Sequence, residues 1–130
     1  MFTKEDLILA HSKVKTGVDF PNYIQDCKKL GVIYYETFVQ DGRSIFVGKN
    51  NYSVTLLPKY ERINIASTLQ VEQFKKYLLA HQKGTTDFIQ FCKDCSETGI
   101  EKWKIDLCKM NCTYLDIAGN EVLIEQIPLS

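Results

Sequence analysis

The chain has 130 residues, of which 45% are hydrophobic and 25% are charged, with 16 basic and 16 acidic side chains. A net charge of zero argues against a general nucleic-acid binder, which needs a positive field to neutralise phosphates. One globular domain spanning 1–130 is expected at this length and composition. The apolar runs are too short for a membrane helix and the first residues do not read as a signal peptide. We therefore expect a cytoplasmic protein with neither nucleic acid nor membrane as a partner.

Four helices are predicted from apolar residues at helical spacing. They are expected over about 4–13, 20–30, 68–82 and 88–98. Thr3 is placed as an N-cap, and Ser67 with Gln70 has the spacing of a capping box before the third helix. Gly31 and Gly99 follow the second and fourth helices, where a C-terminal glycine is typical.

Six strands are predicted from β-branched and aromatic residues bounded by turn signals. They are expected over 32–39, 43–47, 52–57, 101–107, 111–116 and 121–127. Asp41-Gly42 is a strong hairpin signal between the first two strands. Pro58 begins a connection over 58–66, in which Ile63–Ala66 has the composition of a further short edge strand.

An internal repeat organises these elements. The stretch from Asp19 to Val54 aligns without a gap with Asp87 to Val122, and His11 aligns with His81 after a small shift. Each half is too small to bury a core of its own. We therefore predict an α+β fold of two α-α-β-β-β repeats, over about 3–57 and 67–128, related by pseudo-two-fold symmetry. The helices would pack on antiparallel sheet around a single shared core. The alternative is chance agreement between two amphipathic patterns.

Five cysteines offer a possible metal site, because Cys92-x-x-Cys95 and Cys108-x-x-x-Cys112 resemble a four-thiolate zinc pattern. Cys92 and Cys95 fall on the apolar face of a predicted helix, however, where a buried thiol acts as a small hydrophobic group. We favour a structural role and assign no metal, with zinc binding and redox pairing as the alternatives.

Two histidines occupy matching places near the ends of helices. His11 and His81 lie on or near the inward helix faces, where a histidine can donate to the last carbonyls of the helix. Alternatively, the repeat brings both to a shared cleft, where they could act as bases or ligand donors.

The outer face of the predicted sheet differs between the halves. Tyr34, Glu36 and Phe38 stand where the second half carries Lys102, Lys104 and Asp106. An aromatic pair facing solvent is typical of a partner or ligand surface. The alternative is that the connection over 58–66 covers Tyr34 and Phe38.

Several separated segments resemble, in order, a family of small bacterial and prophage-associated proteins of unknown function. The matching segments are Ala10-His11-Ser12-x-Val14-Lys15-x-Gly17-x-Asp19-Phe20-Pro21, Tyr35-Glu36-Thr37, Asp41-Gly42, Glu101-Lys102-Trp103 and Ala118-Gly119-Asn120-Glu121-Val122-Leu123-Ile124-Glu125-Gln126-Ile127-Pro128. Some members carry the label "phage envelope protein", so the resemblance implies a prophage-encoded protein. It implies no activity, cofactor or catalytic residue.

The sequence shows no nucleophile elbow, glycine-rich phosphate loop or H-E-x-x-H motif. We therefore favour a non-catalytic binding or protein-interaction module, with an unknown protein or small molecule as its partner and no cofactor. Tyr34, Glu36, Phe38, His11 and His81 are the candidate contact residues. One alternative is a small enzyme using His11, His81 or Glu36 in a cleft between the repeats. The other is a structural component of a virion.

Overall fold

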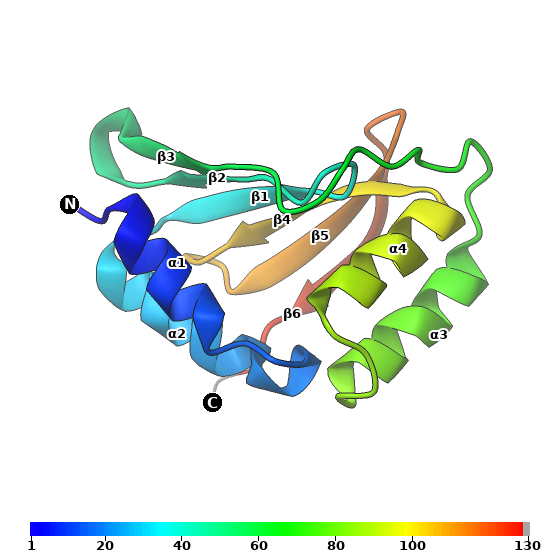
Figure 1. Cartoon of the computed structure of the whole chain (residues 1–130), viewed down its shortest axis with the longest axis horizontal. Coiled ribbons are helices and arrows are strands. Elements are labelled where there is room, and N and C mark those ends of the chain that lie inside the picture. Colours follow the sequence, from blue (N-terminus) through cyan, green and yellow to red (C-terminus); the bar gives the residue numbers. More distant parts are fainter. Residues whose placement is uncertain (129–130) are drawn as a thin grey trace.

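The computed structural model describes residues 1–128 and has an α+β architecture (Figure 1). Its helices are α1 Lys4–Ser12, α2 Phe20–Leu30, α3 Val71–Gln82 and α4 Phe88–Thr98. Its strands are β1 Tyr34–Phe38, β2 Ser44–Val47, β3 Ser53–Leu56, β4 Ile100–Asp106, β5 Asn111–Asp116 and β6 Glu121–Gln126. Short 3-10 helices cover Gly17–Asp19 and Lys49–Asn51. The predicted helices and strands are confirmed, with small shifts at their ends.

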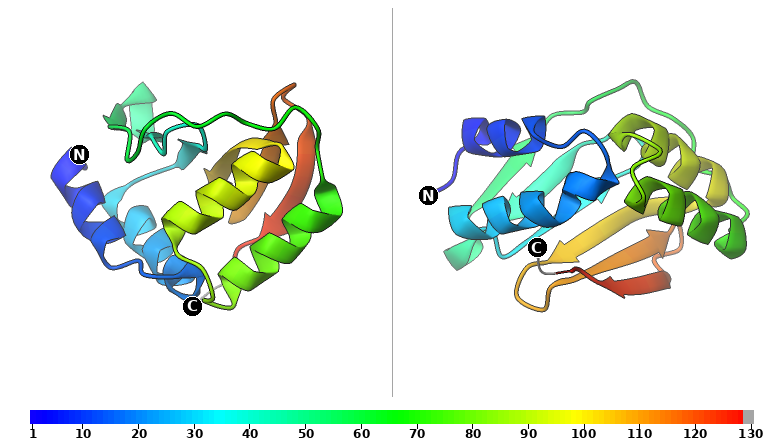
Figure 2. Two further views of the ribbon diagram at one scale, coloured as in Figure 1. Left: turned by 45° about the vertical axis from the view of Figure 1, so that its right-hand side comes forward. Right: turned by 90° about the horizontal axis from the view of Figure 1, so that it is seen from below.

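The six strands form one antiparallel sheet in the order β3-β2-β1-β4-β5-β6. The centre is the β1–β4 pair, in which Tyr35 lies opposite Ile105 and Thr37 lies opposite Trp103. The helices cover one face of the sheet in two pairs, α1 with α2 and α3 with α4 (Figures 1 and 2). The α+β class with helices on antiparallel sheet is therefore confirmed.

The helix ends follow from local chemistry in most places. Thr3 and Asp6 form a reciprocal capping box at the start of α1. Gly31 and Gly99 end α2 and α4 with φ angles of 98° and 90°, which an L side chain adopts only with strain.

The capping box expected at Ser67 and Gln70 is wrong, because α3 begins only at Val71 without a side-chain cap. The backbone amide of Gln70 donates instead to the carbonyl of Thr98 at the end of α4. The chain therefore stays non-helical until it has passed that helix end.

The connection after β3 has no regular structure over Ile63–Ala66, so the suggested edge strand is wrong. The Ile63 amide donates to Gln40 in the β1–β2 turn, and the Ala66 amide donates to Ser96 in α4. These bonds hold the segment against the β1–β2 turn and against α4, and the segment is not part of the sheet. The connection crosses the molecule in front of the sheet, on the side of the helices (Figure 1).

The buried apolar residues form one cluster that draws on both helix pairs and the sheet. Four of the five cysteines lie in this region: Cys27, Cys92, Cys95 and Cys112 are buried, and burial raises their thiol pKa values. Cys108 is exposed, so the expectation of a core role fails for that residue alone.

Candidate functional site: an aromatic cavity between the helix pairs

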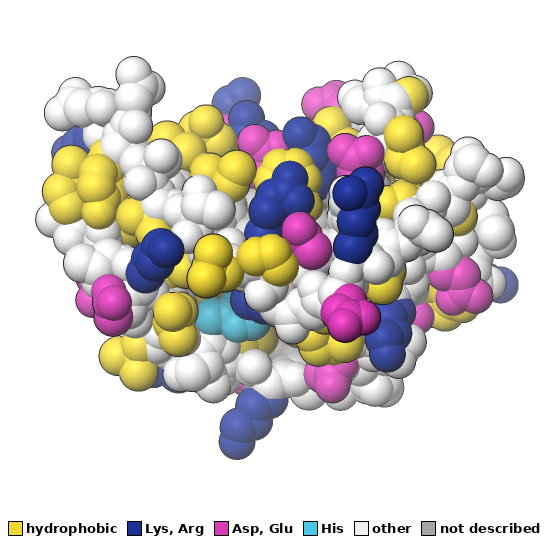
Figure 3. Space-filling view, turned by 45° about the horizontal axis from the view of Figure 1, so that its top comes forward, with side chains coloured by type: hydrophobic (Ala, Val, Ile, Leu, Met, Phe, Trp, Pro, Cys, Tyr) yellow, Lys and Arg dark blue, Asp and Glu magenta, His cyan; other side chains and the backbone are white. Residues whose placement is uncertain are grey.

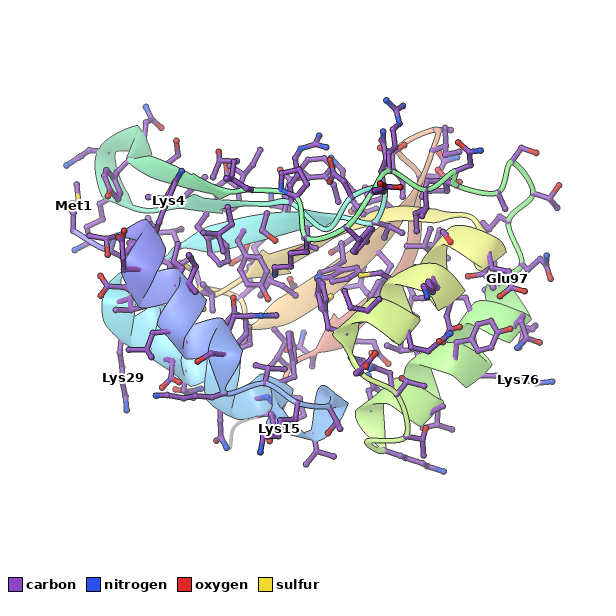
Figure 4. The ribbon with its side chains drawn as sticks, viewed as in Figure 1. Met1, Lys4, Lys15, Lys29, Lys76 and Glu97 are labelled. Atoms are coloured by element: carbon purple, nitrogen blue, oxygen red, sulfur yellow. The ribbon has the colours of Figure 1, made fainter. Side chains whose placement is uncertain are left out.

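A cavity of about 470 Å³ lies between the two helix pairs, above the sheet. Its floor consists of inward-facing sheet residues, among them Tyr35 and Thr37 of β1 and Trp103 of β4. Its walls come from the last turns of α1 and α3, the loop between α1 and α2, the first turns of α2 and α4, and the end of β6 with the residues that follow it. Charged side chains such as Lys29 and Lys76 point outward from the helices, away from this space (Figure 4).

Gly17 closes one end of the cavity by bringing the α1–α2 loop against the end of α3. A Cβ atom on Gly17 would lie 2.1 Å from the carbonyl oxygen of His81, closer than any side chain can approach. Glycine at this position therefore lets the two helix pairs meet while leaving the space above the sheet open.

Aromatic rings dominate the lining. The seven are Phe20, Tyr23, Tyr35, Phe88, Phe91, Trp103 and Tyr114. The centroid of the Trp103 ring system lies 5.4 Å from that of Phe91 and 6.1 Å from that of Phe88. These distances and tilts are those of favourable aromatic contacts, so the rings hold one another in place and the cavity is preformed.

His11 lies in the cavity wall between two of these rings. Its ring meets Tyr23 and Phe88 edge to face, at centroid distances of 5.3 and 5.2 Å. Burial and, to a lesser extent, the positive charge of Lys59 together lower the pKa of His11 from 6.5 to about 4. The imidazole is therefore neutral at pH 7, with one nitrogen that donates and one that accepts.

His81 also lines the cavity and is held more firmly. Its ring stacks on Phe91 at 4.3 Å between centroids, and its Nδ1 lies 3.2 Å from the carbonyl oxygen of Thr86. The hydroxyl oxygen of Thr86 lies 3.1 Å from the same nitrogen and can donate or accept, so Nδ1 has a partner in either tautomer. Burial lowers the pKa of His81 as well.

Two further ionisable groups that the sequence did not single out reach the lining, Lys59 and Glu125. The Lys59 ammonium nitrogen lies 4.5 Å from the centroid of Phe88, and partial burial lowers its pKa. Glu125 accepts a hydrogen bond of 2.8 Å from the amide of Gln82 at the end of α3.

Of the five residues singled out from the sequence, the structure brings the two histidines to one cavity. Glu36 lies on the opposite face of the sheet, because β1 alternates and its inward positions are Tyr35 and Thr37. A site combining Glu36 with the histidines is therefore wrong. No spacing in the sequence indicated Lys59, which lies in the irregular connection.

The outer face of the sheet carries Tyr34, Glu36 and Phe38 beside the lysines of β4. Lys102 forms an ion pair of 2.8 Å with Glu36, and the Lys104 ammonium lies 4.6 Å from the Tyr34 ring centroid. The connection makes its backbone bonds on the other side of the sheet, so it does not cover these rings. Lys104 of the second half lies over Tyr34, whereas Phe38 lies under Arg43 of its own half at 4.1 Å, with Lys102 farther away at 5.5 Å.

Within residues 1–128, no three His, Cys, Asp or Glu side chains lie close enough together to hold a metal ion. Across the same range, no helix combines the length and the apolar character needed to cross a membrane. One patch of histidine colour is visible beside hydrophobic side chains in Figure 3, and both histidines line the cavity, so part of the site region reaches the surface.

The fold and the cavity define a small α+β protein whose helix pairs enclose an aromatic-lined space on one face of an antiparallel sheet. The chain belongs to DUF1398, a family of proteins of unknown function, whose model matches residues 9–126. A search of curated proteins gives no match. The family match carries no information on a phage label or a prophage, so both stay predictions.

Proposed function

We propose that this protein is a non-catalytic binding module that holds a small, mainly apolar molecule in the cavity above the sheet. The cavity itself is the observation that supports this proposal. Its volume of about 470 Å³ lies within the range of roughly 300 to 1,000 Å³ that is usual for small-molecule sites. An apolar lining with a few polar groups is also the common composition of such sites.

The shape of the lining favours a ligand with a flat ring system. Phe88, Phe91 and Trp103 present ring faces and edges at mutual distances suited to aromatic contacts. A planar ligand extends that packing, and each aromatic pair contributes roughly 0.5 to 1.5 kcal/mol beyond the area that it buries.

A neutral aromatic dye, N-phenyl-1-naphthylamine, tests the proposal directly. Its emission rises in an apolar site, and Trp103, the single tryptophan of the chain, lines the cavity and can transfer energy to it. We expect saturable binding of one dye per chain, with Trp103 emission falling in parallel. A linear, unsaturable rise in dye emission without loss of Trp103 emission would refute the proposal.

A pair of variants on the same segment locates the binding. Val14→Phe adds bulk at the cavity lining, and Ile8→Phe adds a similar ring at an exposed position of α1 outside it, so that Trp103 stays the single tryptophan in both. We expect weaker dye binding in the first variant and unchanged binding in the second, with both folded by circular dichroism. Equal binding in the two folded variants would place the dye elsewhere.

A small enzyme remains a second candidate, because His11 and His81 both line the cavity. Burial lowers the pKa of both, so each imidazole is neutral at pH 7 and can donate or accept a hydrogen bond with a substrate. Mass spectrometry of a ligand recovered after long incubation separates the two functions. A binding module returns it unchanged, whereas an enzyme returns product that His11→Gln reduces.

We infer also that the two halves are copies of one unit. The bounds of α4 match those of α2 at the spacing that aligns Asp19 with Asp87, and the strand order is symmetric about the β1–β4 pair. Tyr35 lies opposite Phe46, and the residues aligned with them, Trp103 and Tyr114, also lie opposite each other. Superposition of the halves in a crystal structure tests this, and different helix placements would contradict it.

A cytoplasmic location and prophage encoding are further predictions for this binding module, and a structural role in the virion is the alternative to it. Cell fractionation tests the first. Mass spectrometry of purified particles from an induced host tests the last, and absence of the protein from the particles would contradict it.

A further inference from the structure

We propose that the molecule held in the cavity is an amphipathic organic anion, with an aromatic body against the ring lining and one carboxylate against Lys59 and His11. This inference rests on the proposed binding function and names the chemical class of its ligand. Three observations carry it: an unpaired cation at the cavity lining, a neutral histidine beside it, and no carboxylate of the protein competing for either.

Lys59 provides the positive charge. Its backbone amide donates to the Asp41 carbonyl at 2.8 Å, which fixes the residue at the end of the β1–β2 hairpin. The residue is exposed along its length, but its ammonium nitrogen lies 4.5 Å from the centroid of Phe88, a cavity-lining ring. The charge is therefore partly dehydrated at the boundary between the cavity and solvent, where an anion gains most from pairing with it.

Among residues 1–128, no acidic side chain lies within 4.0 Å of the Lys59 ammonium. Three other lysines have such a partner, Lys13, Lys75 and Lys102, but Lys59 is the lysine that lines the cavity. The ring of Phe88 is the contact that Lys59 makes in place of a carboxylate. A bound carboxylate would supply the missing opposite charge.

His11 provides a donor beside this charge. Its ring shares Phe88 with Lys59, at 5.2 Å between centroids, and the charge of Lys59 acts on the imidazole. Within the described part of the chain, neither nitrogen of His11 has a hydrogen-bond partner, whereas His81 is engaged by Thr86. A neutral imidazole can donate one N–H to a carboxylate oxygen.

The one acidic residue that lines the cavity within residues 1–128 is Glu125. It accepts a hydrogen bond from Gln82 at the end of α3, and it forms no ion pair with Lys59 or His11 within these residues. The lining is therefore electrically asymmetric, with its positive charge near Phe88 and an apolar body of rings beyond it. This arrangement suits a ligand with one charged end and disfavours a cationic ligand.

Three naphthalene compounds of nearly equal shape test the charge preference by isothermal titration calorimetry. They are 1-naphthoate, 1-naphthalenemethanol and 1-naphthylmethylammonium. We expect the anion to bind about 10-fold or more tightly than the neutral alcohol, from the strength of a charge-assisted hydrogen bond, and the cation to bind weakest.

Two matched variants assign the preference to Lys59. In Lys59→Met, naphthoate should lose roughly 10-fold in affinity while the alcohol changes by less than about 3-fold. Lys59→Arg keeps the charge and should keep the preference, which guards against a folding defect. Lys75→Met removes an equally long cation from the exposed side of α3 and should leave all three affinities unchanged.

The outcomes distinguish failure of this ligand class from failure of the proposed binding function. If the alcohol binds at the cavity as tightly as naphthoate, the ligand class is wrong and the binding module stands. If Lys59→Met keeps the full preference for the anion, the assignment to Lys59 is wrong. If none of the three compounds binds, both the inference and the proposed function fail.

Discussion

His11 should make the protein less stable as the solution becomes mildly acidic. In the native state the ring lies between Tyr23 and Phe88, and its pKa is about 4. In the unfolded chain the pKa of histidine is about 6.5. Above that value the ring is neutral in both states. As the pH falls below it, the unfolded chain takes up a proton that the native protein does not, which favours unfolding until the pH reaches about 4.

The size of this effect follows from the two pKa values. With these two pKa values, and without screening by solvent, the free energy of unfolding falls by about 2 kcal/mol between about pH 7.5 and about pH 5. The ring keeps some contact with solvent, which screens part of the penalty. We therefore expect a loss of about 1 to 2 kcal/mol from His11 over this interval.

Urea unfolding at a series of pH values measures this loss, with His11→Gln as the comparison. The variant has no titrating ring at the site, so its stability should fall less steeply between about pH 7.5 and about pH 5. His81 also has a lowered pKa and contributes a smaller loss of the same sign, which His81→Gln should remove. Parallel stability profiles for the native protein and His11→Gln would refute the buried, neutral state of His11.

Three further predictions concern the fold. Phe74 is fully buried, so Phe74→Ala should lower the free energy of unfolding by roughly 3 to 5 kcal/mol. Leu79→Ala, at an exposed position of the same helix, should change it little. Equal effects in urea unfolding would contradict the burial of Phe74 in the core. Gly31 has a φ of 98° with open space around it, so Gly31→Ala should cost about 1 kcal/mol through backbone strain alone, and a stabilised variant would contradict that conformation. Cys108 is the exposed thiol, so a thiol reagent should modify one cysteine rapidly in the native protein and five after denaturation. Rapid reaction of more than one cysteine in the native protein would contradict the burial of the other four.

Local signals predicted most of the fold. Thr3, Gly31 and Gly99 mark helix ends through chemistry within a few residues, and alternation in β1 and β5 predicts which side chains face inward. The sequence pattern places the start of α3 too early, because the interaction that sets this start is distant in sequence. The backbone amide of Gln70 donates to the carbonyl of Thr98. A capping pattern cannot reveal such a competing partner.

The cavity was harder to predict than the elements around it. The internal alignment indicates His11 and His81 as candidate residues, and the structure places both in the cavity lining. Lys59 lies in a connection without periodicity, so nothing local indicated that it reaches Phe88. The hypothesis of a site that joins Glu36 to the histidines is wrong, because the outward register of Glu36 in β1 excludes that arrangement.

The most direct test of a cavity that binds an aromatic anion is an NMR titration with 1-naphthoate. We predict intermolecular nuclear Overhauser effects from the naphthalene protons to the ring protons of Phe88 and to the indole of Trp103. The largest shift changes should fall on residues of the cavity lining. Shift changes confined to the outer sheet face around Tyr34 and Lys102, or no saturable change at all, would contradict the account.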